Sequence, residues 1–330
     1  MPGVTRRVGE CPDYCRFCGS SSACSYGPWW LTPGGQSVTP EGWPQWSNLP
    51  KLSDGAVLRD TRAHISGDGP VTSAADRWRE SLAAWAIPDE ILNSAEESPW
   101  IHPPELFGVP DEITPSPSHD RAREALRPDG SVLDVGCGGG VAAFAVTPPA
   151  SHVVGVDQQA AMLAMFQSNA QQRGVTCLTV EGSWPSVAAE TPDADVVTAH
   201  HVVYNVGDIV PFLGALDAHA RTRVVLEMPD RHPLSAMSNA WRHFWDLERP
   251  ERPTPEDLLD VLDEMGLDAH RDTWRGARWS SPSPERAAHF LRVRLCLPAS
   301  REREVYDFLL ATGVTPDRDL STIWWDVATV

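Results

Sequence analysis

Residues 132–140 read Val-Leu-Asp-Val-Gly-Cys-Gly-Gly-Gly, and the interpretation of the whole chain starts from this stretch. Its apolar first half predicts a short strand, which runs directly into the alternating glycines Gly136, Gly138 and Gly140. Glycine has no Cβ, so such a loop can turn sharply and bring its backbone against a ligand. The stretch therefore predicts a strand that ends in a ligand-binding bend.

A second apolar strand is expected at 153–156, and Asp157 follows it. Asp157 lies 157 − 138 = 19 residues beyond the central glycine. A nucleotide-binding βαβ unit places its ribose-binding acid at about this distance. The dinucleotide fingerprint Gly-x-Gly-x-x-Gly would need glycine at position 141, where this chain has Val141. The spacing is Gly-x-Gly-x-Gly instead, and an NAD-dependent oxidoreductase remains an alternative.

The segment 134–140, together with Val156 and Asp157, resembles the first two motifs of class I S-adenosylmethionine (SAM) dependent methyltransferases. The resemblance covers roughly residues 75–330, because alternating strands and helices continue along the chain. It implies an α/β fold with a doubly wound, mostly parallel seven-stranded sheet of the Rossmann-like methyltransferase type. The last two strands of this family form a reversed hairpin beside strand five. Beyond the first two strands, the expected strands are 175–180, 195–199, 223–227, 267–274 and 321–327.

Helices are expected between these strands, with a longer helical insertion before the last strand than the minimal fold has. Gly174 and Gly266 are the expected stops of two of them. The expected helices are 139–146, 158–173, 208–219, 234–248, 255–265, 284–297 and 300–311.

The chain ahead of the sheet divides into three parts. Residues 1–70 are rich in Pro, Gly and Ser and predict a poorly ordered leader, and Val71 is a candidate for the true start of translation. Residues 71–117 predict a helical cap and a proline-rich connector. Ser118 is the expected N-cap of a helix that leads into the methyltransferase domain, residues 118–330.

Four cysteines lie within the leader, and three interpretations of them compete. Cys11, Cys15 and Cys18 resemble the iron–sulfur motif of radical-SAM enzymes, in which three thiolates hold a cluster. Adding Cys24 gives four soft ligands for zinc, although the spacing lacks the usual paired knuckles. The third interpretation is a disordered leader without a metal, and this is the one we adopt.

The composition limits which binding partners and which cellular compartment we expect for the protein. The 330 residues carry a formal net charge of −18, so the chain as a whole does not attract polyphosphate, which argues against nucleic acid. No apolar run approaches the ~20 residues of a membrane span. Seven cysteines, an odd number, and no export signal predict the reducing cytoplasm.

The resemblance assigns the cofactor site. Gly136, Gly138 and Gly140 would allow close approach of the amino-acid tail of SAM. Asp134 would orient this loop and the ammonium end, although capping of the glycine turn is an alternative role. Asp157 would accept hydrogen bonds from both ribose hydroxyls, and it is also a favoured N-cap for the helix that follows.

The adenine position departs from the family pattern. Many members have an aspartate after the third strand, whereas this chain has Ser183 and Trp184. Ser183 can accept one hydrogen bond, and Trp184 offers a ring that can stack on adenine. These two residues complete the predicted cofactor site.

Candidate catalytic residues follow the fourth strand, at the carboxyl edge where open α/β sheets bind ligands. His200 or His201 is a candidate general base, and strand alternation should send only one of them into the cleft. Tyr204 is a further catalytic candidate, and Asn205 is a candidate for contact with the acceptor. Many methyltransferases use no base, because the sulfonium is already activated and positioning does most of the work.

The sequence thus predicts a SAM-dependent methyltransferase with a small-molecule acceptor, no metal and no membrane segment. A catalytically silent SAM-binding module with the same fold is the other alternative. The acceptor, the acceptor atom and the oligomeric state are not predicted.

Overall fold

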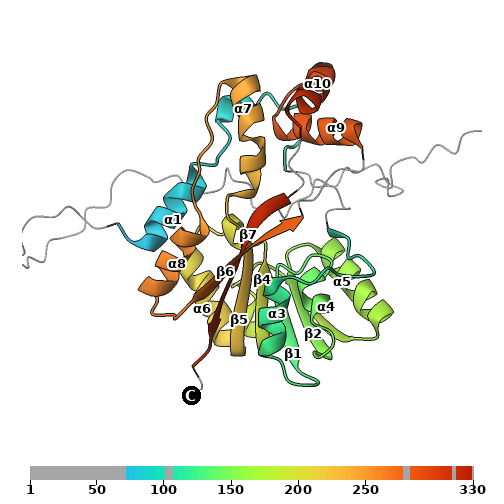
Figure 1. Ribbon diagram of the computed structural model, residues 1–330, viewed down its shortest axis with the longest axis vertical. Helices are drawn as coiled ribbons and strands as arrows, with labels where there is room; N and C mark the ends of the chain where they lie inside the picture. Colours follow the sequence, from blue (N-terminus) through green and yellow to red (C-terminus); the bar gives the residue numbers. More distant parts are fainter. Residues whose placement is uncertain (1–71, 101–106, 278–282, 314–316, 329–330) are drawn as a thin grey trace, which may run out of the picture. The chain divides into compact units, whose positions relative to one another are not determined.

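The computed structural model describes residues 72–100, 107–277, 283–313 and 317–328, all within one compact unit (Figure 1). The predictions for the leader, for Val71 as a start and for Cys11, Cys15, Cys18 and Cys24 fall outside these ranges. They stay predictions.

Within the described residues, seven strands form one sheet in the order β3-β2-β1-β4-β5-β7-β6. The first five strands are parallel, and β7 runs antiparallel to both of its neighbours. The predicted doubly wound sheet with a reversed hairpin beside strand five is therefore confirmed. The strands are β1 (Ser131–Val135), β2 (His152–Asp157), β3 (Thr176–Glu181), β4 (Ala194–His200), β5 (Ala220–Pro229), β6 (His270–Ala277) and β7 (Asp317–Asp326).

The helices fall between the strands in the expected order, and the insertion between β6 and β7 supplies α9 and α10. Gly174 and Gly266 both have positive φ where their helices end, as a C-terminal glycine stop requires. The α-helices are α1 (Ala74–Ala83), α2 (Asp89–Leu92), α3 (Pro117–Glu124), α4 (Val141–Ala145), α5 (Ala160–Arg173), α6 (Ile209–His219), α7 (Ser238–Trp245), α8 (Pro255–Glu264), α9 (Pro284–Arg294) and α10 (Glu302–Thr312).

The two faces of the sheet bury different sets of helices because strand side chains alternate. Leu133, with its counterparts on β4 and β5, belongs to the cluster that includes α1, α6 and α8. Val132 and Val153 point to the other face and pack with α3, α4 and α5. Figure 1 shows these two groups on opposite sides of the sheet. The carboxyl ends of the parallel strands are thereby left at one edge, where the predicted site residues lie.

Helix α1 is part of the main core. Trp78 and Leu82 are fully buried in the same cluster as the central strands. The Trp78 indole N–H donates to the Val206 carbonyl at 2.8 Å, in the loop after β4. This helix therefore supports the loop that carries the candidate catalytic residues.

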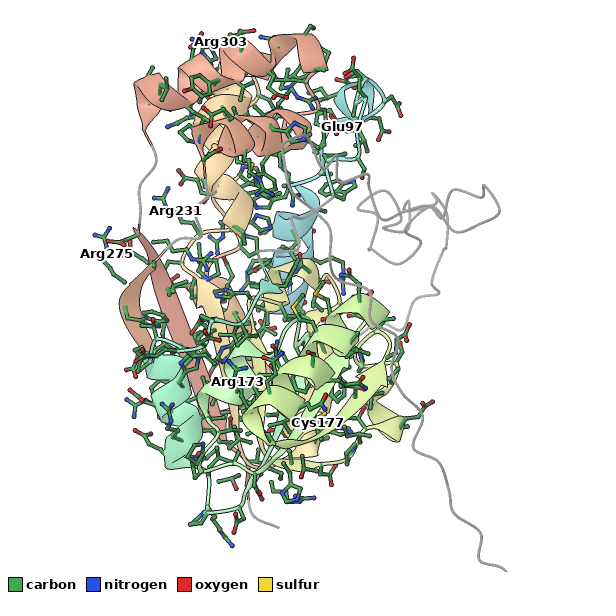
Figure 2. All side chains as sticks on the ribbon, turned by 90° about the vertical axis from the view of Figure 1, so that its right-hand side faces the viewer. Glu97, Arg173, Cys177, Arg231, Arg275 and Arg303 are labelled. Carbon is green, nitrogen blue, oxygen red and sulfur yellow. The ribbon has the colours of Figure 1, made fainter. Side chains whose placement is uncertain are left out.

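A second core joins α2, α7, α9 and α10. Arg292 on α9, only 2% exposed, is held there by two carboxylates. One is Glu97, which follows α2, and the other is Glu302 on α10 at 2.9 Å. Glu97 and the exposed Arg303 are labelled on this part of the molecule in Figure 2. A buried cation is stable here because opposite charge surrounds it.

One expected helix start is wrong. The N-cap of α3 is Ser116, whose hydroxyl accepts from the His119 amide at 3.3 Å, and Pro117 occupies the first helical position. A proline is favoured there because its missing N–H would have no partner in the helix. Ser118 lies inside the helix, fully buried against Thr322 at 2.6 Å.

Candidate functional site

The glycine bend and Asp157 are in direct contact. The Gly138 amide donates to Asp157 Oδ2 at 3.0 Å, and the Gln159 amide donates to Oδ1 at 2.9 Å. Asp157 therefore holds the bend and also begins the turn into α5. Burial raises the pKa of this carboxyl. Each carboxylate oxygen has a second lone pair, so these contacts do not prevent further hydrogen bonds to a ribose.

Asp134 faces inward, beneath the bend. It is 2% exposed, and its Oδ1 accepts from the Thr198 hydroxyl at 3.0 Å. Burial raises its pKa to about 7, and bonds from Thr198 and the Ala143 amide oppose that rise. Its Oδ2 is buried with no hydrogen-bond partner among the described residues. Asp134 thus ties β1 to β4 and α4, and one of its oxygens is left without a donor.

Glycine is required at the three positions of the bend for different physical reasons. All have positive φ, a conformation that other residues rarely adopt. A Cβ at Gly136 would collide with Val202, and a Cβ at Gly140 would collide with Phe144, so packing alone requires both. A Cβ at Gly138 would meet only Phe107, at 3.5 Å. Gly138 is therefore the position at which the bend has room beside it.

The connector before α3 lies against this bend. A Cβ at Gly139 would collide with the Phe107 carbonyl oxygen and would come within 3.1 Å of Val109. Arg173 at the end of α5 donates to the Pro110 carbonyl at 2.9 Å and holds the same segment. The connector thus covers the outer side of the glycine bend.

The two predicted adenine residues lie at the carboxyl end of β3. Ser183 is exposed, whereas Trp184 is half-buried. The Trp184 indole N–H donates to the Phe212 carbonyl at 3.3 Å, and its ring meets His219 edge-on with centroids 4.9 Å apart. Trp184 is therefore fixed against α6.

His200 and His201 end β4 as predicted and have different surroundings. The His200 ring lies 5.8 Å from the His119 ring of α3 and is nearly parallel to it. Burial lowers the pKa of His200 to about 4 and also lowers the pKa of His119. Both rings are therefore neutral at pH 7, and His200 Nε2 is buried without a partner among the described residues.

His201 is paired with a buried carboxylate. Its Nε2 lies 3.0 Å from Glu227 Oε1 and 3.3 Å from the Arg318 guanidinium. The shorter contact is to the charged acceptor, so we place the proton on Nε2 and the lone pair on Nδ1. Burial would raise the pKa of Glu227, but the His201 hydrogen bond and nearby histidines hold it below its usual range. The His201 backbone is strained at φ +60°, and its amide donates to the Glu227 carbonyl at 2.7 Å.

Tyr204 and Asn205 lie on the short 3₁₀ turn that follows, Val203–Asn205. The Tyr204 ring meets His232, which follows β5, at 5.8 Å, and burial raises the Tyr204 pKa. Asn205 is exposed. The two residues thus diverge, with Tyr204 turned toward the loop after β5 and Asn205 toward solvent.

Glu227 and His119 were not predicted as site residues. Glu227 has a signal in the sequence, because a lone acid ends an apolar strand at the carboxyl edge. The β4–β5 register pairs it with His200. His119 has no such signal, since it lies within an ordinary helix and reaches the site only through the packing of α3.

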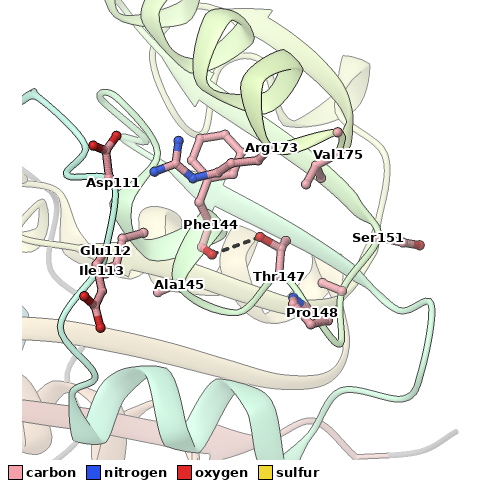
Figure 3. Close-up of a pocket in the computed structure, with 12 residues that line it drawn as sticks. Asp111, Glu112, Ile113, Phe144, Ala145, Thr147, Pro148, Ser151, Arg173 and Val175 are labelled. Atoms are coloured by element: carbon pink, nitrogen blue, oxygen red, sulfur yellow. Dashed lines mark hydrogen bonds between the residues drawn. The ribbon is translucent and has the colours of Figure 1, made fainter.

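A well-formed cavity lies elsewhere. It has a volume of about 490 Å³ and lies between the connector, α4 and α5 (Figure 3). Ser151 and Val175, which line it, precede β2 and β3, so the cavity opens at the amino edge of the sheet. Arg173 and Phe144 form one wall, with the guanidinium 5.4 Å from the ring. The glycine bend lies at the opposite edge, so we do not assign the cofactor to this cavity.

Metal-binding clusters and membrane-spanning helices are both absent from the described residues. No group of three or more His, Cys, Asp or Glu side chains is arranged to hold a metal ion there. None of the helices in that part of the chain combines the length and apolarity needed to cross a bilayer.

Comparison with known proteins identifies the central segment. Residues 132–221 match the family described as a methyltransferase domain. Over 105 residues, 31% of this chain, the sequence is 30% identical to a ubiquinone biosynthesis O-methyltransferase of Aeromonas salmonicida. Over 117 residues, 34% of this chain, it is 33% identical to the protein of that name from Azorhizobium caulinodans. The chain spans about half the length of these relatives, 44% and 45%.

Among solved structures, the YcgJ protein of Bacillus subtilis aligns with a TM-score of 0.45 and 17% identity. The alignment covers 64% of this chain and 97% of that one. The family model, and not this structural alignment, indicates a methyltransferase domain at residues 132–221. The family prediction is confirmed.

The contact between the connector and the bend predicts the effect of Gly139→Ala. Its added Cβ would collide with the Phe107 carbonyl, so we expect a lower unfolding temperature and faster proteolysis within residues 107–113. Gly214→Ala on α6 is the matched control, because a Cβ there meets nothing within 4 Å and alanine favours helix by about 1 kcal/mol. Equal stability of the two variants would refute the contact.

The neutral His200 predicts a pH-dependent difference in stability. The pKa of His200 in the folded protein, about 4, is below the ordinary 6.5. Between pH 6.5 and pH 4 the unfolded chain therefore binds a proton at His200 that the folded chain does not bind. Wild type should therefore lose roughly 1 to 3 kcal/mol relative to His200→Asn as the pH falls from 7 to 4. Urea unfolding of both proteins at several pH values measures this difference. A constant difference would mean that His200 is solvated and titrates normally.

Proposed function

We propose that this chain is an enzyme that uses SAM, bound by the glycine bend and Asp157, to methylate a small molecule. The observation that carries the proposal is the contact of the Gly138 amide with the Asp157 carboxylate. It brings the bend and the ribose-binding acid together, as a nucleoside site at this edge requires.

The residues present fit such a cofactor. Gly138 has room beside it, and the buried Asp134 Oδ2 lacks a donor that an ammonium group would supply. We keep Ser183, which is exposed at the end of β3, as an acceptor for adenine, and Trp184 as its neighbour, although the Trp184 ring is fixed against α6. When bound, SAM supplies an activated methyl group. The protein's part is then to bind, orient and exclude water.

We propose an oxygen atom of the acceptor as the site of methylation. The support is the name of the curated relatives, O-methyltransferases, together with His201 at the carboxyl edge of the sheet, whose buried Nδ1 has no partner among the described residues. His201 donates its Nε2 proton to Glu227, which leaves Nδ1 to accept a proton. Glu227 in turn stabilises the imidazolium that results. His200 and Tyr204 would line the same edge.

The remaining assignments are also proposals. We keep residues 71–117 as a cap with its connector and 118–330 as the methyltransferase domain. We place the protein in the cytoplasm, a choice supported by the free thiols of Cys137, Cys177 and Cys296. The net charge of −18 favours a small acceptor over nucleic acid.

Asp157→Ala tests the proposal through the cofactor. Loss of the ribose contacts and of the Gly138 anchor should weaken SAM binding at least about tenfold in isothermal titration. Asp193→Ala is the matched control, because this exposed acid precedes β4 at the other edge and should leave SAM affinity unchanged.

Three outcomes would contradict parts of the proposal. Unchanged SAM affinity in Asp157→Ala would refute the ribose assignment. Binding of NAD in place of SAM would indicate an oxidoreductase. Binding of SAM without transfer of its labelled methyl group to any molecule of a cell extract would indicate a silent SAM-binding module.

A further inference from the structure

Arg249 is buried without an opposite charge. It is 9% exposed, and it makes no ion pair with any carboxylate of the described residues. Its Nη1 donates to the Ala86 carbonyl at 3.2 Å, its Nη2 donates to the Trp85 carbonyl, and its Nε has no partner in that part of the chain. The guanidinium lies between the rings of Trp85 and Trp241, at 5.3 and 5.2 Å.

Arg292, another buried arginine of this protein, is surrounded differently. Burial lowers the pKa of Arg249. Burial acts on Arg292 in the same direction, but Glu97 and Glu302 raise its pKa above the usual value. An isolated buried cation costs several kcal/mol, which an opposite charge would offset. The described residues supply that charge at Arg292 and none at Arg249.

Arg249 lines a small pocket. A second buried arginine, Arg294, faces the same space, and burial lowers its pKa to about 10. The apolar walls include Leu234, Met237 and Trp241, and no acid lines the pocket among the described residues. Its volume is about 10 Å³, the size of one water-sized group. As it stands, the space therefore holds no more than one water molecule, and a larger group would need side chains to move.

Packed side chains link the pocket to the proposed methyl-transfer site. Leu234 and Met237 belong to the 3₁₀ helix Pro233–Met237, which follows His232. The His232 ring stacks on Trp85 at 4.2 Å and meets Tyr204 at 5.8 Å. A row of three rings thus connects the end of β4 with Arg249.

We infer that Arg249 binds the carboxylate of an acidic methyl acceptor whose other end reaches the β4–β5 edge. This inference rests on the proposed function and names the class of its substrate. A carboxylate matches the guanidinium fork and supplies the missing opposite charge. Met237 and Leu234 are flexible, half-buried side chains that would move aside for the acid.

The test compares an acid with its neutral amide. Isothermal titration of the full chain, without SAM, should show 4-hydroxybenzoate binding at least about tenfold tighter than 4-hydroxybenzamide. Arg249→Met should remove this preference. Arg242→Met is the matched control, because Arg242 is exposed on α7 and pairs with Glu248, so its loss should change nothing.

The outcomes separate this inference from the proposed function. Equal binding of acid and amide, no binding of the acid, or an acid preference that survives in Arg249→Met overturns the inference. If Arg249→Met does not fold, Arg249→Lys replaces it and should weaken acid binding while retaining part of the preference. If the chain binds SAM but not the acid, only this inference is refuted. If the chain binds the acid but not SAM, the proposed function is refuted.

Discussion

The hydrogen bond from the Gly138 amide to the Asp157 carboxylate is the contact on which the rest of the site depends. It joins the bend after β1 to the end of β2, two segments that the parallel sheet places side by side. Asp134 supports the bend from below through Thr198, and the connector lies across it at Gly139. The conformation of the glycine bend is thus fixed by contacts among four parts of the chain: β1 with its bend, β2, β4 and the connector.

The same edge of the sheet also gathers the groups of the proposed proton transfer. Parallel pairing of β4 and β5 sets His200 opposite Glu227, and the strained backbone of His201 turns its ring to the same carboxylate. Burial keeps His200 neutral, whereas Glu227 stays ionised because histidines and their hydrogen bonds surround it. The carboxyl ends of the parallel strands therefore position both the proposed cofactor site and the proposed base.

Much of this could be predicted from the sequence, because strand and helix periodicity with a glycine bend is a local signal. The positions of the strands along the chain and the place of Asp157 after the second strand follow from it, whereas the reversed hairpin was implied by the family resemblance. Contacts set by tertiary packing could not be predicted. The cover of Gly139 by Phe107, the place of His119 beside His200 and the isolation of Arg249 each depend on segments far apart in sequence. The N-cap of α3 was misplaced although the sequence holds the signal: Pro117 is favoured at the first helical position, which makes Ser116 the N-cap.

A crystal structure of the protein with S-adenosylhomocysteine, the demethylated form of SAM, tests the central claim most directly. The account predicts ribose hydroxyls on the Asp157 carboxylate, with the Gly138 amide still bonded to it and the amino-acid tail along the glycine bend. A nucleoside bound in the cavity at the amino edge, or a bend still covered by packed side chains, would contradict it.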